Sequence, residues 1–126
     1  MNIEELKFNE KGLIPCVTQD YDDGQVLMVA YMNKESIQKT LEEGKACYFS
    51  RSRNKLWLKG EESGNTQEVK GIYTDCDKDT ILLKVKQIGG CACHEGYRSC
   101  FFRKYEGNDW EVVEDKVKDP DSMYDK

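Results

Sequence analysis

Residues 12–32 read GLIPCVTQDYDDGQVLMVAYM, and this stretch decides the fold. Two apolar runs, 12–20 and 25–32, flank the segment YDDG, which consists largely of turn-forming residues. Apolar runs on either side of a short turn are typical of a β-hairpin. We therefore expect two antiparallel strands here, with Cys16 as an inert residue buried in the first of them.

The segment NKESIQKTLEEG at 33–44 carries the signals of a helix. Asn33 suits an N-cap, and Gly44 is a natural stop. Ile37 and Leu41 share one face at spacing i,i+4, which is typical of a helix.

Short apolar runs make up most of the remaining chain and predict further strands. These runs are ACYFS (46–50), KLWLK (55–59), QEVKGIYT (67–74), TILLKVKQI (80–88), FFRKY (101–105) and DWEVVE (109–114). Turn-rich linkers separate them, and a glycine- and cysteine-rich loop follows the fourth. The sum predicts a single α+β domain with a mostly antiparallel sheet and one or two helices.

Length and charge narrow the function classes. The chain has 126 residues, 34% of them charged, with a net charge of -5, which fits one well-solvated domain. The segment 104–126 holds eight acids and four bases, so we expect an acidic, partly frayed extension. The chain lacks the excess of basic residues that nucleic-acid-binding proteins carry. No apolar run is long enough for a membrane span or a secretion signal, so we expect a cytoplasmic protein.

Six cysteines in a cytosolic chain indicate metal binding or catalysis more than disulfides. Cys93 and Cys100 flank HEGYRS, and Cys76 precedes a predicted strand. Three thiolates can hold Zn²⁺ and leave the fourth position to water, as in catalytic sites. The alternative is that these cysteines are buried and inert. Cys47 is ambiguous, and Cys91 is a candidate fourth ligand.

Asp75, Asp77 and Asp79 surround Cys76 in the stretch TDCDKDT. Carboxylate oxygens suit Mg²⁺ or Ca²⁺, although a solvated acidic turn is the simpler interpretation. An EF-hand starting at Asp75 fails, because Thr80 and a lysine replace the required glycine and glutamate. If the segment is extended, its side chains alternate, so the aspartates face away from Cys76.

His94 is the one histidine of the chain and adjoins Cys93, so it is a candidate for proton transfer near neutral pH. A basic run at 50–59 offers phosphate-binding and base-stacking groups. Its candidates for substrate binding are Ser50, Arg51, Ser52, Arg53, Trp57 and Lys59. The alternatives are a hydrogen-bonded histidine and a solvated hairpin face.

Several of these blocks together resemble the phosphoribosyl-AMP cyclohydrolase family of histidine biosynthesis, in its monofunctional form. The matching stretches are GLIPCVTQD, VLMVAYMNKES, TLEEGKACYFSRSRNKLWLKGEESGNTQ, DCDKD and QIGGCACHEGYRSCFFR, in the family's order over about residues 12–103. Each stretch alone is weak, but the set is highly specific.

The resemblance implies hydrolytic opening of the adenine ring of phosphoribosyl-AMP between N1 and C6. It also implies an intertwined homodimer that needs zinc and magnesium. The zinc cysteines carry over to Cys76, Cys93 and Cys100, and the magnesium aspartates to Asp75, Asp77 and Asp79. The zinc site is expected to form between subunits, and zinc is expected to activate water for attack at C6.

The chain departs from the family's usual pattern at four positions. Cys47 and Asn65 stand where the family often has histidine, Glu95 where it often has threonine, and Cys91 where it often has alanine. Asn65 cannot act as a general base near pH 7. Two other hypotheses remain: a structural zinc or interaction module without chemistry, and a calcium-responsive acidic protein, which the failed EF-hand makes the weakest.

Overall fold

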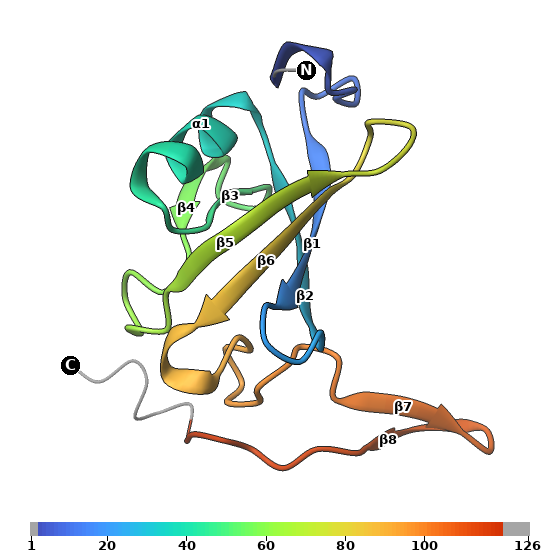
Figure 1. Cartoon of the computed structure of the whole chain (residues 1–126). Coiled ribbons are helices and arrows are strands. Elements are labelled where there is room, and N and C mark those ends of the chain that lie inside the picture. The colour runs from blue at the N-terminus through green and yellow to red at the C-terminus, as the bar shows by residue number, and fades with distance from the viewer. Residues whose placement is uncertain (1–2, 120–126) are drawn as a thin grey trace.

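The computed structural model describes residues 3–119 of the chain, and its largest sheet has four strands in the order β2-β1-β6-β5 (Figure 1). These strands are β1 (Ile14–Asp20), β2 (Val26–Met32), β5 (Gln67–Thr74) and β6 (Ile81–Gln87). β1 pairs antiparallel with β2, which confirms the predicted hairpin. β6 pairs antiparallel with β5 and parallel with β1.

One face of this sheet carries the core. Buried and partly exposed residues alternate along β1 and β6, because successive side chains of a strand point to opposite faces. The buried members are Ile14, Cys16, Thr18, Ile81, Leu83 and Val85. Helix α1 (Lys34–Glu43) and strand β3 (Cys47–Ser50) supply Ile37 and Tyr48 to the same core. The predicted burial of Cys16 is confirmed.

The predicted ends of helix α1 are confirmed. The Asn33 side chain accepts a hydrogen bond from the Ser36 amide at 2.8 Å, and the Ser36 hydroxyl accepts one from the Asn33 amide at 2.8 Å. This reciprocal capping satisfies two amides that the first turn leaves without partners. At the other end Gly44 takes φ 72°, a left-handed conformation that ends a helix at little cost to glycine.

Ile37 and Leu41, which share one face of α1 by their spacing, differ in burial. Ile37 is buried, but Leu41 is 58% exposed. The buried stripe of the helix runs through Ser36, Ile37 and Thr40, so Leu41 lies at the edge of that stripe. Thr40 is buried because its hydroxyl donates to the Ser36 carbonyl at 2.8 Å and accepts from the Cys47 amide at 2.9 Å.

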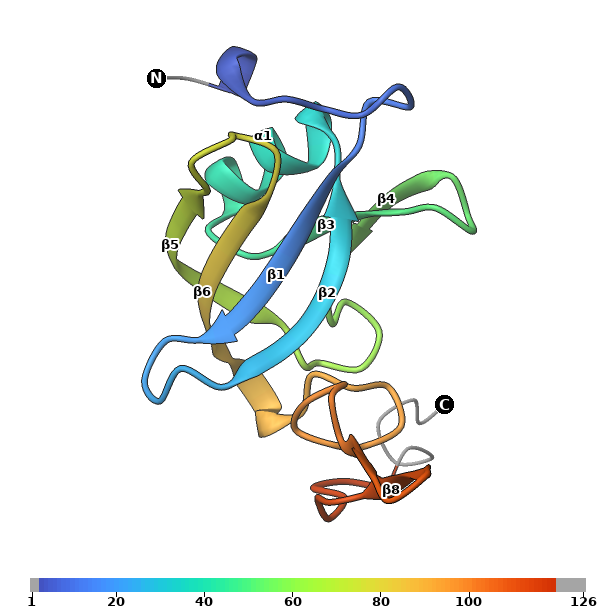
Figure 2. The same ribbon diagram turned by 90° about the vertical axis from the view of Figure 1, so that its right-hand side faces the viewer.

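The remaining elements are small. β3 and β4 (Lys55–Leu58) form a two-stranded hairpin that extends beyond the main sheet (Figure 2). β7 (Arg103–Glu106) and β8 (Asp109–Val112) form a second, fully exposed hairpin. Short 3-10 turns lie at Ile3–Glu5 and Ile88–Gly90. The α+β class with one helix and mostly antiparallel pairing is confirmed.

A chain of buried hydrogen bonds links β3 to the main sheet. The Tyr48 hydroxyl lies 2.7 Å from the Thr18 hydroxyl and donates to the Gln67 side-chain oxygen at 2.6 Å. The Gln67 side-chain nitrogen donates to the Gln87 side chain at 2.8 Å. Such a network is stabilising only while every buried member keeps its partners.

We expect Tyr48→Phe to lower the free energy of unfolding by about 1–3 kcal/mol, because it leaves the Gln67 oxygen buried without its donor. Urea unfolding of the wild type and the variant measures the difference. Tyr105→Phe is the matched control, because Tyr105 is exposed and its edge contact with Trp110 survives the change. Equal effects of the two substitutions would contradict the assigned role of the network.

Candidate active site

The cysteine loop, residues 91–100, follows β6 and lies beyond the end of the main sheet (Figure 1). Two backbone hydrogen bonds close it like a small hairpin. The Ala92 amide donates to the Arg98 carbonyl at 3.0 Å, and the Cys93 amide donates to the Tyr97 carbonyl at 3.1 Å. The loop therefore has a defined shape that fixes the direction of its side chains.

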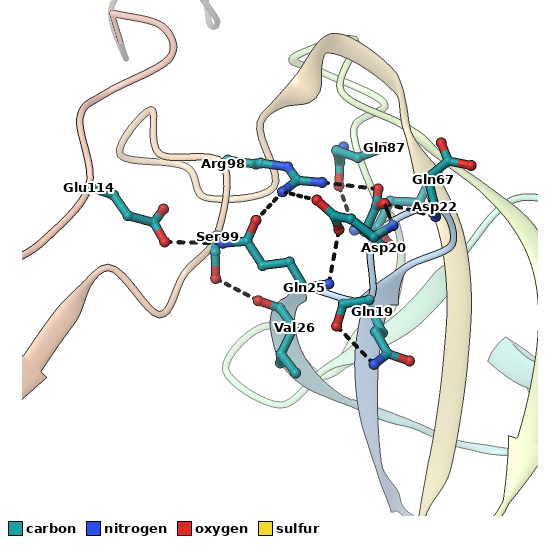
Figure 3. Close-up of polar contacts among 12 residues, drawn as sticks. Gln19, Asp20, Asp22, Gln25, Val26, Gln67, Gln87, Arg98, Ser99 and Glu114 are labelled. Carbon is teal, nitrogen blue, oxygen red and sulfur yellow. Dashed lines mark hydrogen bonds and ion pairs between the residues drawn. The ribbon is translucent and has the colours of Figure 1, made fainter.

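Arg98 and Ser99 anchor this loop to the turn between β1 and β2 (Figure 3). The Arg98 guanidinium lies 3.3 Å from Asp20 and 2.9 Å from Asp23, and the Ser99 hydroxyl donates to the Val26 carbonyl at 2.7 Å. The hydrogen bond from Arg98 lowers the pKa of Asp23 to about 2. The pair thus stays charged at all pH values where the protein is expected to work. Sequence analysis missed Arg98, although it stands between two candidate zinc ligands.

Cys93 and Cys100 come together within one chain. Cys93 is close enough to Cys100 to influence its charge, and the Cys100 amide donates to the Leu27 carbonyl at 2.7 Å. Desolvation and the adjacent Cys93 raise the pKa of Cys100 to about 12, whereas Lys59 opposes the rise. Two adjacent thiols fit a soft metal ion, which deprotonates the thiols it binds.

Lys59 is buried beside these thiols. Its Nζ donates to the Ala92 carbonyl at 2.6 Å and lies 5.5 Å from the centre of the Trp57 ring. Burial lowers the pKa of Lys59, while the nearby Cys100, Cys91 and Cys93 act in the opposite direction. A buried cation here suits a site that accumulates negative charge on sulfur.

Three of the other four cysteines, Cys16, Cys47 and Cys91, have surroundings that differ from those of this pair. Cys16 and Cys47 are buried in strands, and burial raises the pKa of both thiols, that of Cys16 to about 12. Cys91 is also buried, and its thiol donates to the carbonyls of Cys93 at 3.2 Å and Tyr97 at 3.1 Å. This orientation stabilises the loop and favours a structural role for Cys91 over a fourth metal ligand.

Asp75, Asp77 and Asp79 gather in the turn between β5 and β6. Among residues 3–119 they are the one group of three or more potential ligands whose atoms lie within 4.8 Å of one another. The extended conformation considered from sequence is wrong, because the segment bends and Lys78 takes φ 62°. The Cys76 thiol consequently lies 3.8 Å from an Asp77 oxygen and does not face away from the aspartates.

The aspartates influence one another's charge. Slight desolvation raises the pKa of Asp75, but hydrogen bonds from Asp79 and neighbouring amides outweigh it and hold that pKa below its ordinary value. The hydrogen bond with Asp75 raises the pKa of Asp79 above its ordinary value. Three carboxylates this close together concentrate negative charge, and a divalent cation with oxygen ligands would relieve it.

Cys76 lies far from Cys93 and Cys100 of the same chain. The aspartate turn precedes β6, and the cysteine loop follows it at the opposite end of the strand (Figure 1). β6 has seven residues, which at about 3.3 Å each separate the two segments by about 20 Å. Three thiol ligands on one ion therefore require two chains.

A pocket of about 780 Å³ brings the basic run and His94 together. His94 comes from the cysteine loop, and the opposite wall comes from the β3–β4 hairpin and the segment after it. The lining residues are Ser50, Ser52, Arg53, Lys55, Leu56, Trp57, Lys59, Gly60, Glu61, Glu62, Ser63 and His94. All but one of the substrate-binding residues expected from sequence line this pocket, whereas Lys55, Glu61, Glu62 and Ser63 were not among them.

Arg51 is the exception. Its guanidinium lies 4.0 Å from the centre of the Tyr31 ring, on β2, and it does not line the pocket. The arrangement is a cation–π contact, which holds the turn at the tip of the β3–β4 hairpin against β2. Arg53 follows two residues later and lines the pocket, with its amide donating to the Ser50 hydroxyl at 3.3 Å.

No helix among residues 3–119 has both the length and the apolar character needed to cross a membrane.

Comparison with known proteins places these features in one family. The family model for phosphoribosyl-AMP cyclohydrolase matches residues 28–102. The phosphoribosyl-AMP cyclohydrolase of Thioalkalivibrio sulfidiphilus is 54% identical over 122 residues, which cover 97% of this chain and 93% of the relative. That of Chlorobaculum parvum is 56% identical over 125 residues, covering 98% and 90%.

A protein of the same name from Pseudomonas paraeruginosa is 50% identical over 123 residues, covering 98% of this chain and 92% of the relative. The similarity includes the strands that build the core, the pocket wall and the cysteine loop, and it is far above the level at which family membership is in question. The chain belongs to the phosphoribosyl-AMP cyclohydrolases, a family of enzymes.

Proposed function

We propose that the protein hydrolyses phosphoribosyl-AMP, opening its adenine ring between N1 and C6 as the third step of histidine biosynthesis in the cytoplasm. The observation that carries this proposal is the pocket, where His94 lines the same cavity as the basic wall, formed by Arg53, Lys55 and Lys59. The neighbouring thiols of Cys93 and Cys100 lie in the loop that carries His94. A nucleotide with two phosphates needs cationic groups for binding, and ring hydrolysis needs proton transfer and activated water.

The basic wall would position the substrate. Arg53, Lys55 and the hydroxyls of Ser50 and Ser52 can hold phosphate oxygens, because guanidinium and ammonium groups form charge-assisted hydrogen bonds with them. Trp57 offers a flat apolar surface for the adenine ring. Fixing both ends of the nucleotide in this way supplies much of the rate enhancement that orientation can give.

The donors present fit zinc and magnesium. Cys93 and Cys100 of one subunit would hold zinc together with Cys76 of a second subunit, which accounts for their separation within one chain. A bound zinc ion would supply Lewis acidity, which makes water nucleophilic near neutral pH. Asp75, Asp77 and Asp79 would hold magnesium through oxygen ligands.

His94 would move the proton. It is exposed at the pocket wall, so its ring is free to approach both the incoming water and the adenine nitrogen. A histidine suits this role because its ordinary pKa lies near neutral pH, which lets the ring both accept and release a proton. Glu95, beside it, turns its amide toward Cys93 Sγ at 3.4 Å and so supports the sulfur ligand.

The decisive experiment is an activity assay on phosphoribosyl-AMP with zinc content measured on the same sample. We expect turnover in the zinc-loaded protein, loss after chelation and recovery on adding zinc. His94→Ala should lower kcat about 10²–10⁴-fold, the usual contribution of general acid–base catalysis, with zinc content and the circular dichroism spectrum unchanged. A structural zinc module predicts no turnover in any sample.

A mixing experiment tests the shared zinc site. Cys76→Ser and Cys100→Ser should each be inactive, because each removes a ligand from every site. After subunit exchange in an equal mixture, about one quarter of wild-type activity should return, since half of the dimers of a two-fold assembly are mixed and contain one intact site.

Cys93→Ser mixed with Cys100→Ser is the matched control. Both ligands come from the same subunit, so no combination restores a complete site, and activity should stay absent. Recovery in the control, or none in the test mixture once exchange is verified by mass spectrometry, would contradict a zinc site built from two chains.

Substitutions of Arg53 and Arg51 distinguish a role in substrate binding from a role in packing within the protein. We expect Arg53→Gln to raise the KM for phosphoribosyl-AMP about tenfold or more, because a hydrogen bond to a charged group contributes about 1.5–3 kcal/mol. Arg51→Gln should change KM much less, since its guanidinium packs on Tyr31 outside the pocket. Steady-state kinetics on both variants decide the matter, and equal KM values would refute the assignment of Arg53.

A further inference from the structure

The chain returns to the cysteine loop after its exposed hairpin. Residues 113–118, the C-terminal strap, run along this loop. At the start of the strap, the Val113 amide donates to the Phe102 carbonyl at 2.9 Å, and Glu114 accepts a hydrogen bond from the Gln25 side chain at 3.0 Å (Figure 3). The strap is thus held both to the chain that leaves the cysteine loop and to the turn that anchors Arg98.

The far end of the strap bonds the tip of the cysteine loop. The amides of Val117 and Lys118 both donate to the Gly96 carbonyl, at 2.7 Å and 3.1 Å. The Lys118 ammonium reaches in the opposite direction and donates to the Asn65 side-chain oxygen at 2.9 Å. Lys118 therefore connects two segments that are 31 positions apart in sequence and follow different strands.

Asn65 is a rigid attachment point. It is 2% exposed, and its carbonyl accepts a hydrogen bond from the Gln87 side chain at 2.9 Å. Its backbone lies against Gly60 and its side chain against Gly89 so closely that a Cβ at either glycine would overlap it. Gly60 and Gly89 also have positive φ values, 85° and 81°, that other residues rarely adopt.

The two attachment points belong to the two walls of the pocket. Asn65 ends the segment that contributes Gly60, Glu61, Glu62 and Ser63 to one wall. Gly96 lies two residues after His94, which forms the other wall. A contact that ties Asn65 to Gly96 therefore limits the distance between the lining segment 60–63, which follows the basic run, and the loop that carries His94.

We propose that Lys118 is a positioning residue, which holds the two walls of the substrate pocket together through Asn65 and Gly96. This inference rests on the proposed function, because it concerns the same pocket. Most of the strap is exposed, so it buries little apolar surface and contributes little to the core. Its effect falls instead on the alignment of His94 with a substrate held by the basic wall.

The test is Lys118→Met, which keeps the aliphatic stem of the side chain and removes its hydrogen bond. We expect kcat for phosphoribosyl-AMP to fall about tenfold or more, because small misplacements of catalytic groups have large effects on rate. KM should change less than threefold, since the phosphate-binding residues of the basic wall remain in place. Lys118→Arg, which keeps a charged donor, should recover most of the rate.

Two controls distinguish positioning from stability. Lys104→Met removes an exposed lysine of the β7–β8 hairpin that pairs with Glu106 at 2.9 Å, and it should leave kcat unchanged. Asn65→Ala combined with Lys118→Met should lower kcat no further than Asn65→Ala alone, because both remove the same contact. Unchanged kcat in Lys118→Met, additive effects in the double variant, or an equal loss in Lys104→Met would overturn the proposal.

Hydrogen exchange separates this proposal from the enzyme assignment. The amides of Ala92, Cys93 and Gly96 are hydrogen-bonded within the cysteine loop, and we expect them to exchange at least fivefold faster in Lys118→Met than in Lys104→Met. If the wild type fails to turn over phosphoribosyl-AMP, the proposed function fails, and this measurement still decides whether the strap holds the loop. Equal exchange in both variants would refute the strap itself.

Discussion

The pairing of β6 with β1 on one side and β5 on the other is the constraint from which the site follows. Because β5 and β6 are antiparallel, the turn that joins them and the loop that leaves β6 must lie at opposite ends of the sheet. That direction separates Cys76 from Cys93 and Cys100 by the full length of a strand. Buried side chains of β6 fix the register, since a shift of one residue would turn Ile81, Leu83 and Val85 away from the core.

The cysteine loop has no regular strand or helix to hold it, so its position depends on specific polar contacts. Arg98 ties it to the β1–β2 turn, Lys59 ties it to the hairpin that carries the basic run, and Lys118 ties it to Asn65. The side chains of Arg98, Lys59 and Lys118 are charged donors, which form stronger hydrogen bonds than neutral ones, whereas the bond from Lys118 to the loop itself is made by its amide. The loop is consequently held by contacts with three separate segments of the chain, and Lys59 places a cation beside its thiols.

Local sequence signals proved reliable where one segment decides its own structure. The hairpin of 12–32, the capped helix ending at Gly44 and the six further strands all follow from period, turn residues and caps. Such signals do not predict the exposure of Leu41, because the number of helix residues that are buried depends on what packs against the helix. The bend at Lys78 likewise depends on the turn that joins β5 to β6, which an extended interpretation of the aspartates ignored.

The sequence by itself determined the fold class, the family and the residue types available for chemistry, because strand alternation, caps and motif spacing are local properties of the chain. Only the tertiary structure decided which of those residues meet. It places Cys93 near Cys100 and His94 in the same pocket as the basic run. It also packs Arg51 on Tyr31 and separates Cys76 from Cys93 and Cys100. Side-chain encounters of this kind depend on strand direction and on contacts between segments far apart in the chain, and no local pattern encodes them.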